Sequence, residues 1–184
     1  MPIIVAIDTE TTGLGHRLEP PQDDAIIQVG IAWRDTSGKL STWGSLCLPD
    51  KKYFANGRAD RALEVNKLGI NDILKAKTDI IVARDLRVKL TEIKTKHRKE
   101  VELRAYNLKF DEPFLRKKPW NIPTSIWGPC IMRSTSNYFR LGMANLKLAD
   151  ALDKLGIKKP KGNLHNAETD ATAALLINER LNEH

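Results

Sequence analysis

The chain has 184 residues, of which 41% are hydrophobic and 29% charged, a balance typical of a soluble globular protein. This length predicts one domain, residues 1–184, whose core needs no disulfide or metal in order to form. Two cysteines are too few for a secreted disulfide scaffold, and no apolar run reaches the roughly 20 residues of a membrane span. The N-terminus also lacks the pattern of a signal peptide, so we expect a cytoplasmic protein without a membrane partner.

The net charge is +7, from 30 Lys and Arg against 23 Asp and Glu. A basic protein suits a polyanionic partner, and nucleic acid is the commonest polyanion. Many basic proteins are simply soluble, so the charge alone leaves a nucleic-acid partner and a solvated surface equally open.

Three strands are expected first along the chain. The first ends in a continuous apolar run, which is typical of a central strand buried on both faces. The other two flank a turn at 35–38, which predicts an antiparallel hairpin. The expected strands are 1–7, 25–33 and 40–48.

The rest of the chain alternates helices with one or two strands. A 3.6-residue apolar period predicts a long helix from Asp79 to about His97. The segment 49–78 is harder to interpret and is expected to hold two short helices, whereas 119–129, rich in proline and tryptophan, is expected to be irregular. The remaining expected elements are a strand at 101–106, a helix capped by Asp111, and helices at 146–155 and 166–181. This order predicts an α/β domain with a mixed sheet.

Two acids follow the first apolar run. Asp8 and Glu10 are two residues apart, so on an extended strand their side chains point to the same face. Carboxylates held close repel each other unless a cation lies between them, and open α/β sheets place ligands at the carboxyl ends of strands. The alternative is that Asp8 caps a turn and Glu10 is a solvated surface acid.

Two more acids and a histidine lie further along the chain. Asp111 follows the short strand and could be only a helix cap. Asp170 shares a helical stripe with Ala174 and Ile177, and an acid that faces inward is costly unless it is paired or bound to metal. His165 is expected on the loop before this last helix, either close to the site or as an exposed loop histidine.

Together these segments resemble the DnaQ-like (DEDDh) 3′–5′ exonuclease family, in the family's order and over nearly the whole chain. The motifs are Asp-x-Glu-Thr-Thr-Gly from Asp8, Asn-x-x-Phe-Asp from Asn107 and His-x-x-x-x-Asp from His165. The resemblance implies an RNase H-like fold with a five-stranded mixed sheet flanked by helices. It also implies four metal-binding acids and a histidine general base, all of them catalytic: Asp8, Glu10, Asp111, Asp170 and His165.

The chemistry of these residues agrees with the resemblance. Two divalent cations neutralise four ionised carboxylates, and an all-oxygen ligand set favours Mg²⁺ or Mn²⁺ over zinc. Two such ions about 4 Å apart activate water, hold the scissile phosphate and stabilise the leaving oxygen. A neutral His165 can accept the proton of the attacking water, so that the 3′-terminal nucleotide leaves as a 5′-monophosphate.

In the family, the residues just after the first two acids cradle the terminal nucleotide. By position these are Thr11, Thr12 and Leu14, and Asn107 matches a further position that helps to fix this nucleotide. The alternative is turn formation for the threonines and core packing for Leu14. Many relatives carry an acid where this chain has Gln28, and nothing firm follows from that difference.

Basic residues flank the segments expected to be catalytic. Those at 116–118 and 158–161 lie next to Asp111 and His165 in the sequence, so contact with phosphate is an open interpretation for them. The larger set along 84–99 is better explained as the solvated face of the long helix.

The expected substrate is the 3′ end of a nucleic acid, mainly single-stranded, with DNA somewhat favoured over RNA and DNA repair as the setting. The alternatives are an exoribonuclease, a polymerase-associated proofreading subunit, and a nucleic-acid-binding module without turnover. The sequence identifies neither the oligomeric state nor the role of residues 49–78.

Overall fold

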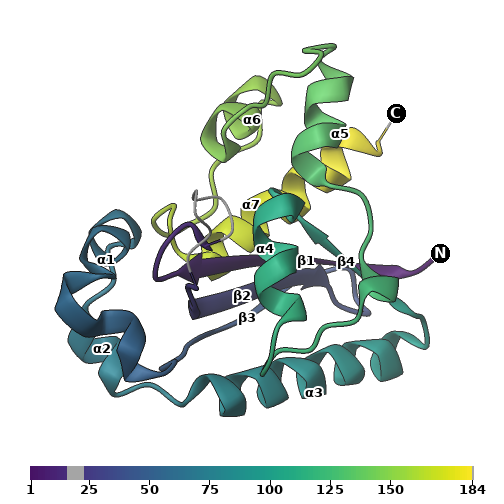
Figure 1. Ribbon diagram of the computed structural model, residues 1–184. Helices are drawn as coiled ribbons and strands as arrows, with labels where there is room; N and C mark the ends of the chain where they lie inside the picture. The colour runs from purple at the N-terminus through teal and green to yellow at the C-terminus, as the bar shows by residue number, and fades with distance from the viewer. Residues whose placement is uncertain (16–22, 184) are drawn as a thin grey trace.

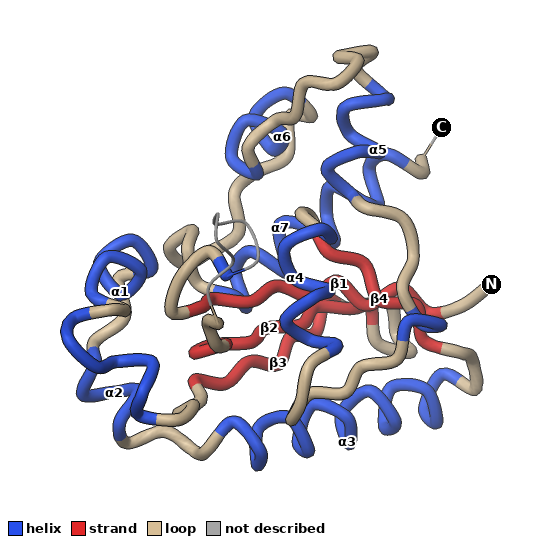
Figure 2. Tube along the Cα trace, in the orientation of Figure 1, coloured by secondary structure: helices blue, strands red, loops and turns tan. Residues whose placement is uncertain are grey.

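In the computed structural model, which describes residues 1–15 and 23–183, a β-sheet lies between two layers of helices (Figures 1 and 2). The strand order is β3-β2-β1-β4. β1 pairs antiparallel with β2 and parallel with β4, and β2 pairs antiparallel with β3, so the predicted α/β domain with a mixed sheet is confirmed. The strands are β1 (Ile3–Thr11), β2 (Ile26–Arg34), β3 (Leu40–Leu46) and β4 (Val101–Ala105).

The predicted long helix is confirmed at both of its ends. The α-helices of the described residues are α1 (Asp60–Asn66), α2 (Ile70–Leu74), α3 (Asp79–His97), α4 (Leu108–Arg116), α5 (Ile131–Tyr138), α6 (Leu148–Lys154) and α7 (Ala167–Leu181). No sequence pattern indicated α5, because its Ser, Thr and Asn residues are weak helix formers and burial of Ile131 in the core stabilises the helix instead. Within the described residues, no helix combines the length and the apolar character needed to cross a membrane.

The expected fifth strand is wrong for the described part of the chain, whose sheet has four strands. The chain passes beside β4 once more, but it forms only one parallel bridge, between Trp127 and Leu103. The amide of Gly128 donates to the Leu103 carbonyl at 2.8 Å, and Pro129 then has no N–H with which to extend the ladder. A short 3₁₀ helix, η3 (Thr124–Ile126), occupies the residues before the bridge, so pairing cannot extend in that direction either.

Alternation along β1 sends its side chains into two separate cores. Val5 and Ile7 lie in the core that α3 and α4 cover, whereas Ala6 lies in the core that α5, α6 and α7 cover. All three side chains are fully buried, as expected for a central strand. The side chains at the carboxyl end of β1 therefore face α4 at odd positions and α7 at even positions.

Residues 49–78 form a small helical unit beyond the carboxyl end of β1 (Figure 1), and the two short helices expected in this segment are confirmed. The unit contains a 3₁₀ segment, η2 (Lys51–Gly57), followed by α1 and α2. Its own apolar cluster includes Leu63 and Ile73, which pack against Ile27 of β2. This packing fixes α1 beside the end of the sheet where the predicted acids lie.

Candidate metal centre and nucleotide cavity

Three carboxylates meet at the carboxyl end of β1. Asp8 and Glu10 project from the face of β1 that α7 covers, and Asp170 projects from the first turns of α7. One oxygen atom of each residue lies within 4.8 Å of the others. Glu10 is only 8% exposed, so it is not the solvated surface acid of the alternative interpretation, and Asp170, at 9% exposed, faces inward as expected.

The fourth predicted acid, Asp111, approaches from the opposite face of the sheet. Its Oδ1 atom accepts hydrogen bonds from the Thr9 amide at 3.0 Å and the Thr9 hydroxyl at 2.8 Å. Thr9 occupies an odd position of β1, so alternation turns it toward α4 while Asp8 and Glu10 face α7. Asn107 is the cap residue of α4, so the expectation that Asp111 caps this helix is wrong.

Burial and mutual repulsion raise the pKa values of the clustered acids. Loss of hydration is the largest cause at Asp8, and the charges of Asp111, Glu10 and Asp170 raise its pKa further. Burial, with repulsion from Asp170 and Asp111, raises the pKa of Glu10 to about 8. Burial raises the pKa of Asp170 to about 6, while the backbone N–H and the side chain of His165 act in the opposite direction. Acids arranged in this way become stable in their ionised form when a cation supplies the missing positive charge.

The hydrogen bonding of Asp170 also fits a bound cation. Its Oδ2 atom accepts a hydrogen bond from the His165 amide at 3.3 Å, but its buried Oδ1 atom has no hydrogen-bond partner among the described residues. A buried carboxylate oxygen without a partner is costly, and a cluster of carboxylate oxygens is the ligand set that hard divalent cations prefer. The three clustered acids therefore form a candidate site for a divalent metal ion.

His165 lies on the loop before α7, as predicted, and its side chain is exposed. Its backbone φ of 71° is left-handed, which turns the chain sharply just before the helix begins. Asn166 then caps α7 by accepting hydrogen bonds from the amides of Glu168 and Thr169 at 3.2 and 3.3 Å. The cap and the turn together hold the His165 backbone against Asp170.

Gln28 anchors α7 to the sheet. It occupies the position at which many relatives carry an acid, a difference from which nothing firm followed in the sequence. Its Oε1 atom accepts a hydrogen bond from the Ala167 amide at 3.1 Å, and its side chain is buried. The hydrogen bond needs only an acceptor, so a neutral amide can make it without adding another negative charge near Glu10, which pairs with Gln28 across the sheet.

A cavity of about 440 Å³ opens beside the carboxylates, between the end of β1 and α1. Glu10, Thr11, Thr12 and Leu14 form one wall of this cavity, which we call the nucleotide cavity. Leu14 is 52% exposed, so the alternative that it packs in the core is wrong. Thr11 and Thr12 are buried and hold the turn after β1: the Thr11 hydroxyl donates to the Gly13 carbonyl at 2.6 Å.

Asn107, the remaining predicted substrate-binding residue, is half-buried at the start of α4. Its carbonyl accepts hydrogen bonds from the amides of Phe110 and Asp111. Phe110 lines the nucleotide cavity, so Asn107 lies at the base of a helix turn that contributes to the cavity wall.

Asp24 is a residue of this site that the sequence did not reveal, because no motif or spacing marks the pair of acids before β2. Its carboxylate is buried and accepts hydrogen bonds from the Thr12 hydroxyl at 3.0 Å and the Gly15 amide at 2.9 Å. A Cβ atom at Gly13 would lie 2.6 Å from the same carboxylate. Arg58, from the 49–78 unit, lies 3.6 Å from it. Asp24 therefore shapes the turn that carries Leu14.

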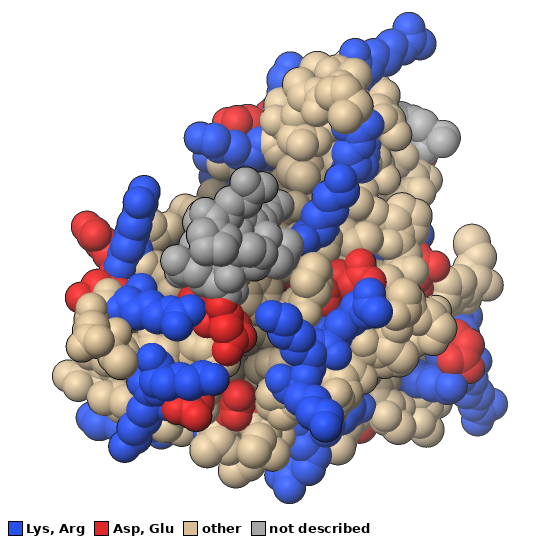
Figure 3. Space-filling view, in the orientation of Figure 1, with Lys and Arg blue, Asp and Glu red and all other residues tan. Residues whose placement is uncertain are grey.

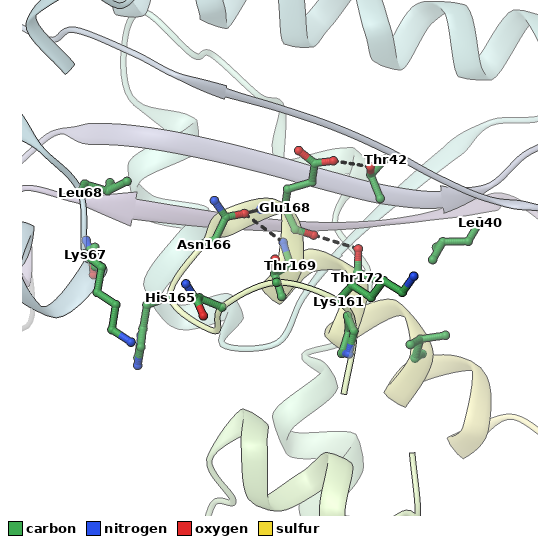
Figure 4. A pocket seen from close by; sticks show the side chains of 15 residues that line it. Leu40, Thr42, Lys67, Leu68, Lys161, His165, Asn166, Glu168, Thr169 and Thr172 are labelled. Carbon is green, nitrogen blue, oxygen red and sulfur yellow. Dashed lines mark hydrogen bonds between the residues drawn. The ribbon is translucent and has the colours of Figure 1, made fainter. Parts of the chain in front are cut away.

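A second cavity, of about 620 Å³, lies beside the loop that carries His165 (Figure 4), and we call it the histidine-side cavity. Its walls come from β3, the N-terminal turns of α7, and the connection between α1 and α2. Lys67 extends from this connection toward the loop of His165, and Lys161 lies on the far side (Figure 4). Asn66 lines both cavities, and sequence reasoning did not single it out.

Lys and Arg side chains are spread over the face of the molecule shown in Figure 3, including the regions of α1 and α4. Several of those on α3 have local partners: Lys89 lies 2.6 Å from Glu92, and Arg87 donates to the carbonyl oxygens of Pro119 and Trp120. These contacts support the interpretation that the Lys and Arg side chains of α3 form a solvated helix face with local structural contacts.

No family model and no curated protein sequence matches the chain. Its fold is nevertheless similar to that of solved nuclease structures. The nuclease domain of 3'hExo, described as a DEDDh family member bound to rAMP, gives a TM-score of 0.75 at 21% identity, over 97% of this chain and 90% of that one. E. coli Exonuclease I in complex with a dT13 oligonucleotide gives 0.72 at 14% identity, over 100% of this chain and 41% of that one.

A third structure, Exonuclease X in complex with 5′ overhanging duplex DNA, gives a TM-score of 0.58 at 21% identity, over 95% of this chain and 89% of that one. The chain therefore has the fold of the DnaQ-like DEDDh exonucleases, and the predicted resemblance is confirmed at the level of the fold. Within this fold the chain carries an acidic cluster able to bind metal, at the end of its central strand.

Proposed function

We propose that residues 1–184 form a single exonuclease domain that shortens nucleic acids from the 3′ end and releases nucleoside 5′-monophosphates. The observation that carries the proposal is the meeting of Asp8, Glu10 and Asp170 within 4.8 Å, with one buried Asp170 oxygen that lacks a partner among the described residues. The similarity to exonuclease structures supports this reading of the cluster. Single-stranded ends, with DNA favoured over RNA, are the proposed substrates.

The residues present would hold divalent metal, with Mg²⁺ or Mn²⁺ as the proposed ions and two ions in each site. Asp8, Glu10 and Asp170 would supply the clustered oxygen ligands, and Asp111 would support them from the α4 side. When bound, the metal would supply Lewis-acid activation of water and neutralisation of charge on the phosphate.

His165 is the proposed general base. A neutral imidazole on an exposed loop beside Asp170 can accept a proton from a water molecule as the water oxygen attacks the phosphorus. The bond between phosphorus and the 3′ oxygen of the preceding nucleotide breaks. The products are a nucleoside 5′-monophosphate and a strand, one nucleotide shorter, that ends in a 3′ hydroxyl.

The nucleotide cavity would receive the terminal nucleotide. Leu14 presents an exposed apolar side chain at the cavity wall, suited to packing against a base. Thr11 and Thr12 hold the turn that carries Leu14, and Asn107 supports the start of α4 on the other side. These four residues are the proposed substrate-binding set.

The proposal is tested with 5′-labelled single-stranded DNA and RNA of matched sequence, incubated with Mg²⁺, with Mn²⁺ or with EDTA. We expect metal-dependent shortening from the 3′ end, abolished in Asp8→Ala and retained in Asp85→Ala, a matched substitution on the surface of α3. Binding of the oligonucleotides without cleavage under any metal would favour a binding module instead. Cleavage that requires an added polymerase would favour a proofreading subunit.

A further inference from the structure

α3 presents apolar side chains to solvent on the side that faces away from the sheet. Its other side packs in the core that contains Val5 and Ile7, and in Figures 1 and 2 the helix lies along the edge of the molecule. Ile80, Ile81 and Val88 are nevertheless 67%, 37% and 51% exposed. Ile81 and Val88 are two turns apart, so they lie on one face of the helix. Single exposed apolar residues need no explanation, but a series on one face is typical of a contact surface.

The residue types on this face are poor choices for an isolated helix. Thr91 and Thr95 follow Val88 at intervals of three and four residues, so they extend the same face. All these side chains are β-branched, which lowers their helix propensity relative to Ala, Leu or Lys. The Thr91 hydroxyl donates to the Arg87 carbonyl at 2.9 Å, so the helix itself satisfies this polar group and the methyl group is left for an apolar contact. A partner that covers this face would explain the series.

A groove of about 470 Å³ runs along the same face, and we call it the α3 groove. On an α-helix, residues four apart form a ridge, and the grooves between ridges receive the side chains of a second helix. The two ridges here are Arg84, Val88, Glu92 and Lys96, and Arg87, Thr91 and Thr95. Arg84 and Lys96 are twelve residues apart, so the groove is about 18 Å long, the length of about three turns of a second helix.

The α3 groove carries an excess of positive charge. Three of its lining residues are cations: Arg84, Arg87 and Lys96. The only acid among the described residues that line it is Glu92, which lies 2.6 Å from Lys89. Arg87 donates to two neutral backbone carbonyls, so it is held in place without losing its charge. The groove is therefore suited to carboxylates.

Asp85, which follows Arg84, does not remove this excess. Its carboxylate lies 2.9 Å from Lys77 and 3.2 Å from Arg84, so one negative charge is shared between two cations. Both cations are well exposed, and exposed ion pairs contribute little to stability. Arg84 can therefore exchange Asp85 for a carboxylate of a partner at little cost.

The chemistry of the α3 groove favours one kind of occupant. No aromatic ring is among the described residues that line it, so it offers nothing on which nucleic-acid bases could stack. A second copy of the chain would bring the same positive charge to the groove. Faces that insert into membranes carry Trp, Phe or Leu, whereas this face carries Ile, Val and Thr. An aliphatic groove with excess positive charge matches an acidic amphipathic helix.

We propose that the α3 groove binds an acidic amphipathic helix of a partner protein. The apolar side of that helix covers Val88 and Thr91, and its carboxylates pair with Arg84 at one end and Lys96 at the other. α3 and α7 cover opposite faces of the sheet, so a bound partner leaves the acids that face α7 accessible. This interaction is separate from the proposed nuclease function and does not depend on it.

The first experiment measures binding of three fluorescein-labelled peptides of about 16 residues by fluorescence anisotropy. The first peptide has Leu along one helix face and Glu on both flanks. The second has Lys in place of each Glu, and the third has the composition of the first with its Leu residues spread around the helix. We expect the first peptide to bind at least about tenfold more tightly than either of the others. Equal binding of the three peptides, or binding of none, would overturn the inference.

Two substitutions locate the binding site. We expect Val88→Glu and Arg84→Glu each to weaken binding of the acidic peptide about tenfold, and Arg84→Glu to bind the lysine peptide more tightly than wild type does. Leu74→Glu is the matched control, because Leu74 is an exposed apolar residue, 45% exposed, on α2. Thermal unfolding verifies that the variants are folded. Unchanged peptide binding by both α3 variants, at unchanged Tm, would overturn the inference.

The rival occupants are tested with the same Val88→Glu variant. Sedimentation with phosphatidylserine vesicles and gel filtration over a range of protein concentrations compare it with wild type. Vesicle binding or dimer formation that Val88→Glu abolishes would assign the face to a membrane or to a second copy and overturn the inference. Equal behaviour of the two proteins in both assays supports a helical partner. Cleavage of labelled oligonucleotides should be unchanged in Val88→Glu, and a wild type without nuclease activity would contradict the proposed function while the peptide assay still decides this one.

Discussion

Thr9 is the residue of β1 that holds the carboxylate of Asp111. Both its amide and its hydroxyl donate to Asp111 Oδ1, at 3.0 and 2.8 Å, and the contact is buried. A carboxylate held by two donors has a defined orientation, which a catalytic site requires to within a fraction of an ångström. We regard Thr9 as a positioning residue for Asp111.

Thr9→Val removes the hydroxyl but keeps the shape, and Thr9→Ser keeps the hydroxyl. We expect the valine variant to lose about 1 kcal/mol of stability and about tenfold in kcat, because one buried hydrogen bond to a charged group is gone. The serine variant should recover most of the activity. Steady-state kinetics and thermal unfolding of both variants check this, and equal activity of all three proteins would contradict the positioning role.

His165→Ala tests the proposed general base. We expect turnover to fall by about 10²–10⁴-fold, because a positioned proton acceptor contributes that range, while stabilisation by added Mg²⁺ is unchanged. The measurements are kcat and the metal-dependent shift in Tm. His97→Ala, on α3 and remote in sequence from the motifs, is the matched control. Turnover close to that of wild type in His165→Ala would remove this residue from the mechanism.

At the scale of elements, the site depends on how closely the start of α7 approaches β2. A Cβ atom at Gly30 would lie 2.3 Å from the carbonyl carbon of Ala167 and from the amide nitrogen of Glu168. Both are backbone atoms of the helix that carries Asp170, so they cannot move without moving the helix. Gly30 therefore sets the distance between α7 and the two acids of β1.

Gly30→Ala should cost about 3 kcal/mol of stability and most of the metal affinity, because α7 must shift away from the sheet. Gly44 is the cross-strand neighbour of Gly30 on β3, and a Cβ there would meet a Glu168 side-chain oxygen at 2.9 Å. That side chain can rotate, so Gly44→Ala should have a much smaller effect. Denaturant unfolding and metal titration of both variants provide the comparison, and equal effects would contradict the argument.

At the scale of the whole molecule, the acidic cluster links stability to pH. The raised pKa values of Glu10, to about 8, and Asp170, to about 6, mean that the metal-free folded protein binds more protons than the unfolded chain at neutral pH. Their contribution to stability is complete below the unfolded pKa values of about 4 and is lost as the pH rises through the folded values. A bound divalent cation would remove this loss.

Glu10→Gln imitates the protonated residue and so isolates this effect from the other titrating groups. In EDTA, the Tm of the variant minus that of wild type should increase between pH 5 and pH 8, because only wild type gains the destabilising charge. Saturating Mg²⁺ should reverse the difference by stabilising wild type. Glu64→Gln on the exposed face of α1 serves as the control. A difference in Tm that stays constant with pH would contradict the linkage.

Much of the secondary structure of this protein, and the face on which several site residues lie, follows from local patterns in the sequence. The apolar run before Asp8 predicts a buried central strand, and the 3.6-residue period predicts α3 from Asp79 to His97, because the repeat of the backbone itself decides which side chains share a face. The same logic places Asp170 on the buried stripe of α7. Motif order then relates the four acids and His165 to a known fold.

Only the tertiary structure decided which segments, distant in the sequence, contact each other. Pro129 ends the pairing beside β4, so the sheet has four strands in the described residues. Asp111 contacts Thr9 because this residue of β1 faces α4, and Asn66 lines both cavities because α1 packs beyond the end of β1. A sequence pattern encodes the face on which a side chain lies. The residue that this side chain contacts depends on how the helices and strands pack across the sheet. The sequence pattern does not determine that packing, because the contacting residues are distant along the chain.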